Sequence, residues 1–174
     1  PGIYEETNPG IVAEGRWATI IDEQASGKAY WLSDTAGDRL TFKFYGPAVD
    51  LVAPQGPQGG RFLVSLDGRA VSDLPMNGEG QSYIDLYSAT PKSQVVIRLA
   101  HSLGPNEHTL RLEIAPDHAL GSSGYECAID ALRVVSGERV ALPVLPFLAI
   151  IGALLLNVGL LWRTWRRACW VWRA

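Results

Sequence analysis

Cysteine and histidine are scarce in this sequence, with two and three residues respectively among 174. Neither type recurs at the spacing of a zinc or haem site, so the sequence argues against those metal centres. A Ser-His-Asp triad drawn from Asp117, His118 and the GSSG segment at 121–124 lacks the G-x-S-x-G elbow. We expect His108 and His118 to be surface or turn residues. We therefore predict that the protein is not an enzyme.

Basic residues are also few in most of the chain. Four of the 15 Lys and Arg lie in the last twelve residues, and all 18 Asp and Glu precede Arg139, so the remainder is acidic. An acidic surface without basic clusters argues against nucleic acid as a partner. The glycines at 56–60 are not followed by Lys-Ser or Lys-Thr, which excludes a phosphate-binding loop of the nucleotide-binding type.

Charge is missing altogether from residues 140–162, a run of 23 residues. As a helix rising about 1.5 Å per residue, this run spans roughly 34 Å, enough for a bilayer core of about 30 Å. Arginines follow it at 163–167, so the positive-inside rule places the C-terminus in the cytoplasm. We predict a single-pass protein of the cell membrane with three parts: an extracytoplasmic domain at 1–137, an entry linker and transmembrane helix at 138–162, and a cytoplasmic tail at 163–174.

Two sets of side chains in the C-terminal part carry further expectations. Small and polar residues along the predicted helix are expected to pack against other membrane protein subunits: Ala149, Gly152, Ala153, Asn157 and Gly159. Aromatic and basic residues at its end are expected at the interface with the lipid bilayer: Trp162, Arg163, Trp165, Arg166 and Arg167. With this topology Cys127 and Cys169 lie on opposite sides of the membrane and cannot form a disulfide, and Cys127 is expected to be buried.

The first 137 residues show short apolar runs broken by Gly, Pro, Asn and Asp, with no convincing helix. In RLTFKFY, Leu40, Phe42 and Phe44 share one face, as a half-buried strand requires. Asp67-Gly68 predicts a type I′ hairpin turn. Strands are predicted at 15–21, 28–33, 39–46, 48–53, 61–66, 69–74, 82–88, 93–99, 108–114 and 125–135. This pattern is mainly β and favours an antiparallel jelly-roll β-sandwich, followed by the one C-terminal transmembrane α-helix.

Several segments carry a resemblance to a known family. APQGPQGGRFLVSLDG (53–68), DLYS (85–88), HTLRLEI (108–114) and AIDALRV (128–134) follow one another as in the galactose-binding-domain-like β-sandwiches, which are relatives of carbohydrate-binding modules. The resemblance runs through most of residues 11–135. It implies a jelly-roll fold and a binding role, and does not by itself imply catalysis.

The same resemblance implies a structural calcium ion where the first and last strands meet. The residues that match are Glu5, Glu6 and Asp130, whose oxygen ligands suit calcium. The competing interpretation is a solvated acidic pair plus an aspartate at a strand end. No other cofactor is expected.

Sugar recognition needs an aromatic ring that stacks on a sugar face and polar groups that fix its hydroxyls. The candidates are Tyr30, Trp31, Tyr83 and Tyr87 as aromatics, with Asp34 and Asn106 as polar partners. Tyr30 and Trp31 point to opposite faces of their strand, so at most one of them lies in the core. Trp17 is assigned to the core, and a core position is the competing interpretation for every aromatic candidate.

Two functions follow from these observations. The main prediction is an accessory or structural subunit of a membrane protein complex, with the β-sandwich packed on its outer face. The alternative is a membrane-anchored cell-surface carbohydrate-binding module with a glycan as partner. The short linker at 136–143 favours the first, because it holds the domain close to neighbouring membrane proteins.

Overall fold

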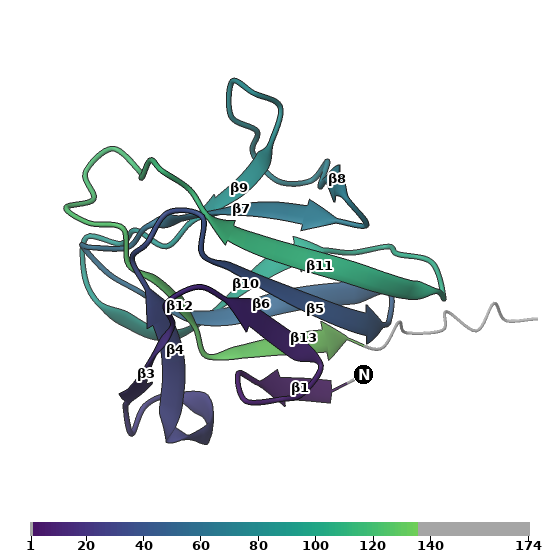
Figure 1. Cartoon of the computed structure of the whole chain (residues 1–174), viewed down its shortest axis with the longest axis horizontal. Helices are drawn as coiled ribbons and strands as arrows, with labels where there is room; N and C mark the ends of the chain where they lie inside the picture. The colour runs from purple at the N-terminus through teal and green to yellow at the C-terminus, as the bar shows by residue number, and fades with distance from the viewer. Residues whose placement is uncertain (1, 136–174) are drawn as a thin grey trace, which may run out of the picture. The chain divides into compact units, whose positions relative to one another are not determined.

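The computed structural model describes residues 2–135, which fall within one compact unit, Pro1–Gly137. Thirteen strands and one short 3-10 helix make up this part of the chain (Figure 1): β1 (Gly2–Glu5), β2 (Ile11–Glu14), β3 (Ala18–Ile21), η1 (Ser26–Lys28), β4 (Ala29–Ser33), β5 (Arg39–Tyr45), β6 (Ala48–Gln55), β7 (Arg61–Leu66), β8 (Arg69–Ala70), β9 (Ser82–Asp85), β10 (Lys92–Ala100), β11 (Glu107–Ile114), β12 (Cys127–Ile129) and β13 (Ala131–Val135).

The strands form three antiparallel sheets. The six-stranded sheet has the order β2-β5-β11-β7-β8, with β9 also paired to β7. The four-stranded sheet has the order β1-β13-β6-β10, and the three-stranded sheet the order β12-β4-β3. The mainly β, antiparallel architecture predicted from the alternating sequence is confirmed.

The hydrophobic core contains inward side chains from both the six-stranded and the four-stranded sheets. Leu40, Phe42 and Phe44 of β5 are all buried, as their alternation predicts. Tyr4 of β1 packs on Phe42, with ring centroids 5.1 Å apart, so the two sheets meet face to face. In strands that alternate in this way, such as β5, one face is committed to the core and the other is left for polar side chains.

The predicted Asp67-Gly68 turn joins β7 to β8. Both residues have positive φ, 52° and 75°, as a type I′ turn requires. The second strand of the hairpin is shorter than predicted, however, since β8 covers only two residues of the expected 69–74.

Other element boundaries also differ from the predictions. The apolar run 125–135 is divided at Asp130 into β12 and β13, which belong to different sheets. The run 15–21 begins as a strand only at Ala18, and 82–88 is a strand only to Asp85. β1 and β2 were not predicted, because each has four residues and a largely exposed pattern with weak alternation.

Three side chains discussed above have clear places in the fold. Cys127 is buried, as expected. Trp17 is partly buried against the core and stacks on Phe62 at 6.5 Å between ring centroids. His108, expected at the surface or in a turn, is instead 8% exposed within β11, because its ring packs beside Phe44.

Strands β1 and β13 are neighbours, with Gly2 opposite Val134. The first and last described strands therefore lie side by side at one edge of the four-stranded sheet (Figure 1).

The predicted transmembrane helix and cytoplasmic tail lie outside the described residues, as do all the helix-packing and membrane-interface residues named above. Within residues 2–135 no helix is long and apolar enough to cross a membrane. The boundary at residue 137 and the membrane topology therefore stay predictions.

Candidate functional site

A pocket of about 410 Å³, here called the loop pocket, is lined mainly by β4, by the end of β6 and by the loops that precede β7 and β12. Its lining includes Tyr30, Leu32, Gln55, Pro57, Gln58 and Glu126. Tyr30 and Leu32 are two residues apart on β4, so both face the pocket while Trp31 between them packs against the core. The pocket thus combines an aromatic ring, two amides and a carboxylate.

The walls of the loop pocket are tied together by backbone hydrogen bonds. Glu126 N–H donates to the Gln58 carbonyl at 2.9 Å, and Gly60 N–H donates to the Glu126 carbonyl at 2.8 Å. A Cβ at Gly59 would lie 2.1 Å from the Leu86 carbonyl oxygen, so only glycine fits there. These contacts hold the glycine-rich 54–60 segment in one conformation, which makes the pocket a preformed one.

The loop pocket is an electronegative environment. The pKa of Tyr30 is raised by burial of its phenol and further by the carboxylates of Asp22 and Glu126. No Lys or Arg is among the described residues that line the pocket. It therefore suits a neutral ligand that donates hydroxyl hydrogens to the carboxylate and the amide oxygens.

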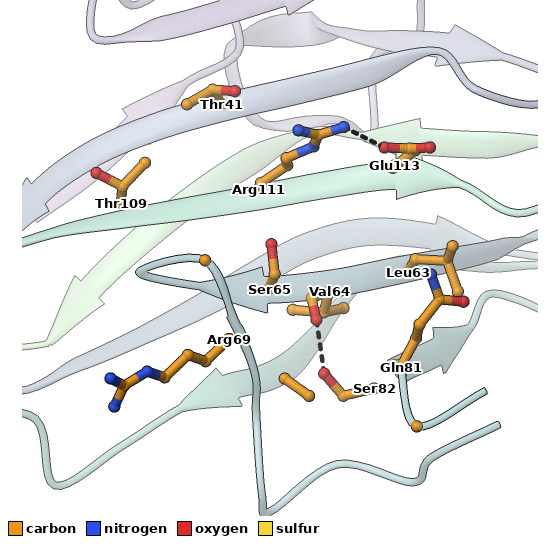
Figure 2. Close-up of a pocket in the computed structure, with 13 residues that line it drawn as sticks. Thr41, Leu63, Val64, Ser65, Arg69, Gln81, Ser82, Thr109, Arg111 and Glu113 are labelled. Carbon is orange, nitrogen blue, oxygen red and sulfur yellow. Dashed lines mark hydrogen bonds and ion pairs between the residues drawn. The ribbon is translucent and has the colours of Figure 1, made fainter. Parts of the chain in front are cut away.

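A second cavity, here called the sheet hollow, has a volume of about 570 Å³ and lies on the outward face of the six-stranded sheet. Figure 2 shows Arg111 of β11 between Thr41 of β5 and Ser65 of β7, with its guanidinium hydrogen-bonded to Glu113. These side chains alternate with core residues such as Leu110 and Leu112. The β7–β8 turn and residues 80–82 complete the lining.

The β7–β8 turn is fixed beside the sheet hollow by Asp67 and His108. Asp67 Oδ1 accepts a hydrogen bond from the Thr109 N–H at 2.8 Å, and Oδ2 lies 2.8 Å from His108 Nδ1. His108 Nε2 faces the Gly104 carbonyl at 3.1 Å. The hydrogen bond to Asp67 is the main cause of a raised His108 pKa, and the same bond lowers the pKa of Asp67.

The other sugar-binding candidates do not converge on the loop pocket. The Arg61 guanidinium covers Tyr83, 4.0 Å from its ring centroid, and itself pairs with Asp85 at 2.8 Å. A Cβ at Gly121 would lie 3.2 Å from the Tyr87 hydroxyl, so this ring is overlaid by the 119–124 loop.

The two polar candidates lie elsewhere on the surface. Asp34 is exposed after β4, and its only hydrogen bond within residues 2–135 is accepted from the neighbouring Thr35 hydroxyl at 3.4 Å. Asn106 is exposed immediately before β11. Of the six candidates, Tyr30 is the one that lines the loop pocket.

The predicted calcium ligands do come together, at the junction of β1, η1 and β13. Ser26 of η1 donates its hydroxyl to Glu5 Oε1 at 2.8 Å and its N–H to Asp130 Oδ2 at 3.0 Å. Glu6 is 4% exposed and Asp130 is 1% exposed. Three buried oxygens in this cluster have no hydrogen-bond partner among the described residues: Glu5 Oε2, Glu6 Oε2 and Asp130 Oδ1.

Burial and mutual repulsion leave these carboxylates poorly compensated. The pKa of Asp130 is raised to about 6, mainly by burial, with Glu5 and Glu6 adding to the effect. The pKa of Glu6 is also raised by burial and by Glu5. Within residues 2–135, no group of three His, Cys, Asp or Glu side chains has the arrangement needed to hold a metal ion. The three unpartnered buried oxygens are nonetheless of the hard, carboxylate type that calcium prefers.

No protein-family model matches the chain, and no curated protein matches it. Among solved structures, a Paenibacillus xanthan lyase matches with a TM-score of 0.58 and 19% identity, over 79% of this chain and 13% of the lyase. A family two carbohydrate esterase from Cellvibrio japonicus matches with a TM-score of 0.53 and 17% identity, over 78% of this chain and 33% of the esterase. The chain therefore corresponds to only part of each of these proteins, and the likeness establishes a shared β-sandwich fold.

A family 35 carbohydrate binding module from Clostridium thermocellum also matches, with a TM-score of 0.49 and 16% identity, over 77% of this chain and 98% of the module.

Sequence reasoning missed most of the loop pocket. Gln58 and Glu126 are far apart in the sequence and meet only through loop-to-loop hydrogen bonds. The one local signal was the segment PQGPQGG, whose two adjacent glycines indicate close backbone approach.

Proposed function

We propose that the protein is a carbohydrate-binding protein and that the loop pocket is its glycan site. One observation carries the proposal: the preformed pocket holds an aromatic ring beside two amides and a carboxylate, without a basic residue in the described lining. Its volume is in the range of about 300–1,000 Å³ that small-ligand sites occupy. Tyr30 would contact a sugar face, and Gln55, Gln58 and Glu126 would bind its hydroxyls.

The fold supports this function as well. Two proteins that share it are described as a xanthan lyase and a carbohydrate esterase. In the two proteins the matched part is only a fraction of the chain, so the enzymatic activities do not transfer to this chain. Binding without catalysis remains our proposal.

Calorimetric titration of the purified protein with neutral β-1,4-linked gluco- and manno-oligosaccharides tests the glycan site. Tyr30→Ala should weaken binding by about tenfold or more, since stacking and hydroxyl contacts are lost together. Tyr45→Ala is the matched control, because Tyr45 is an exposed tyrosine on β5 outside both cavities. Unchanged affinity in a folded Tyr30→Ala variant would move the site elsewhere, and binding of no oligosaccharide would end the proposal.

We also propose that Glu5, Glu6 and Asp130 hold a structural calcium ion. The support is the set of three buried oxygens without partners where β1, η1 and β13 meet. A bound cation would neutralise their repulsion and fasten these elements together.

The accessory-subunit function stays a prediction. It rests on residues 138–174, outside the described part of the chain, and no comparison supports it. The same holds for the cell-membrane location and for partners among membrane proteins and lipids.

A further inference from the structure

The sheet hollow differs from the loop pocket in the sign of its charge. Two lining residues are arginines, Arg69 and Arg111, and Glu113 is the lining carboxylate. Residues 2–135 as a whole contain 10 Lys and Arg against 17 Asp and Glu. The hollow is therefore a locally positive depression on an acidic domain, a distribution that attracts anions to this place in particular.

Arg111 keeps unused donors at the centre of the hollow. It stands directly opposite Thr41 on one side and Ser65 on the other (Figure 2). Its Nη2 pairs with Glu113, while Nε and Nη1 have no partner among the described residues. Nε and Nη1 point along different edges of the planar guanidinium, so each is free to donate a separate charge-assisted hydrogen bond to an incoming carboxylate.

Arg69 adds a second positive charge from the rim. It acts on Asp67 through space, but the two side chains share no hydrogen bond or ion pair within residues 2–135. Arg69 belongs to β8, whereas Arg111 belongs to β11, so the two charges reach the hollow from separate elements.

The remaining polar lining suits a polyhydroxylated ligand rather than a bare anion. Thr41, Ser65 and Thr109 present hydroxyls, and Gln81 presents its amide nitrogen, while its amide oxygen accepts a hydrogen bond from Asn77 Nδ2 at 2.9 Å. The hydroxyl of Ser82, by contrast, is already used, because it donates to the Val64 carbonyl and accepts from the Val71 N–H. Two interstrand spacings separate β5 from β7, about 10 Å in all, which is on the order of a disaccharide's length.

We infer that the sheet hollow binds carboxylated sugars, that is, uronic acid residues of an acidic polysaccharide, with Arg111 holding the carboxylate. Hydroxyls on β5, β7 and β11 contact the sugar ring on either side of it. This site is separate from the proposed glycan site in the loop pocket and does not depend on it.

Calorimetric titration of the full-length protein with trigalacturonate, and with its uncharged methyl ester, tests the inference. The acid should bind about tenfold or more tightly than the ester, because the ester cannot accept a charge-assisted hydrogen bond from Arg111. Arg111→Gln should weaken trigalacturonate binding by about tenfold for the same reason. Glu113→Gln should strengthen it several-fold, because the competing carboxylate is removed.

Controls separate this site from general charge effects and from the loop pocket. Arg16→Gln removes an exposed arginine outside both cavities and should leave binding unchanged. Tyr30→Ala should also leave it unchanged, so loss in that variant would place the ligand in the loop pocket and overturn the inference. Equal affinity for acid and ester would overturn it too. Arg69→Gln, at an exposed position, provides a second variant. If folded Arg111→Gln and Arg69→Gln proteins both bind trigalacturonate as tightly as the wild type, the inferred site is wrong.

Discussion

Both ring nitrogens of His108 face hydrogen-bond acceptors, Asp67 on one side and the Gly104 carbonyl on the other. The imidazole satisfies both only when both nitrogens carry protons. Phe44 packs against the ring, and Arg69 is a further charge acting on Asp67. The stability contributed by this residue must therefore depend on pH.

The direction of that dependence follows from the two pKa shifts. A raised His108 pKa gives stabilisation that is complete below about pH 6.5 and is lost as pH rises through the folded-state pKa. A lowered Asp67 pKa gives stabilisation that is present above about pH 3.9 and lost as pH falls through its folded-state value. The pair thus contributes most between these two limits.

Replacing His108 with glutamine should destabilise the protein more at about pH 5.5 than at about pH 9. Urea unfolding of the wild type and of His108→Gln across this range measures the difference. His101→Gln is the control, since His101 is exposed and pairs only with exposed groups in the described part of the chain. If the stability difference between the wild type and His108→Gln does not vary with pH, protonation of the His108 ring does not contribute to stability, and the prediction is wrong.

Individual residues were predictable where a local rule acts on them. Period two places Tyr30 and Trp31 on opposite faces of β4, and the structure puts one in the loop pocket and the other against the core. Glu126 has no such local signal. Its place in the pocket depends on hydrogen bonds with a loop nearly seventy residues earlier.

At the scale of elements, the segment before β7 is the most sharply constrained. Gly59→Ala would put a methyl group against the Leu86 carbonyl, and backbone atoms cannot move aside cheaply. We expect a loss of about 1–3 kcal/mol in the free energy of unfolding, together with weaker glycan binding. Gly56→Ala in the same loop should be nearly neutral, because an added Cβ meets nothing within 4 Å. Equal unfolding curves for the two variants would contradict the close approach.

The division of 125–135 into β12 and β13 shows why element boundaries were harder to predict. Apolar side chains continue through this segment, so the pattern favours one strand. Asp130 interrupts it because its backbone N–H donates to the Val52 carbonyl while its carboxylate meets Ser26. Such long-range partners leave no trace in the local alternation.

At the scale of the whole molecule, the proposed calcium ion links the start of the described chain to its end. Calcium should raise the thermal midpoint of metal-free protein, since a ligand at 100 times its Kd stabilises the folded state by about 2.7 kcal/mol. Asp130→Asn should abolish that response. It should not destabilise the metal-free protein, because the amide oxygen can still accept from Ser26 and a buried charge is removed.

Differential scanning calorimetry with and without a chelator makes this measurement. Asp34→Asn, at an exposed carboxylate, should keep the calcium response of the wild type. A wild type indifferent to calcium, or an Asp130→Asn protein that responds equally, would rule out the proposed ligands.

The fold as a whole was more predictable than its sites. Alternating runs such as 39–45 and the Asp67-Gly68 turn are local signals, and together they specify an antiparallel sandwich. Sheet order is not local: β11 lies between β5 and β7, and β13 between β1 and β6. Cavities depend on that order, which explains why the sheet hollow, with Arg111 between Thr41 and Ser65, had no sequence signal.

The pairing of Gly2 with Val134 has a consequence for how such a domain can be combined with others. Adjacent antiparallel strands lie about 5 Å apart, so the chain enters and leaves this fold at nearly the same point. A host protein could accept the sandwich within a surface loop without stretching that loop. For the same reason, the domain should tolerate circular permutation. A short peptide would join the two ends, and new termini would be made at another turn, such as Asp67-Gly68, without moving any strand.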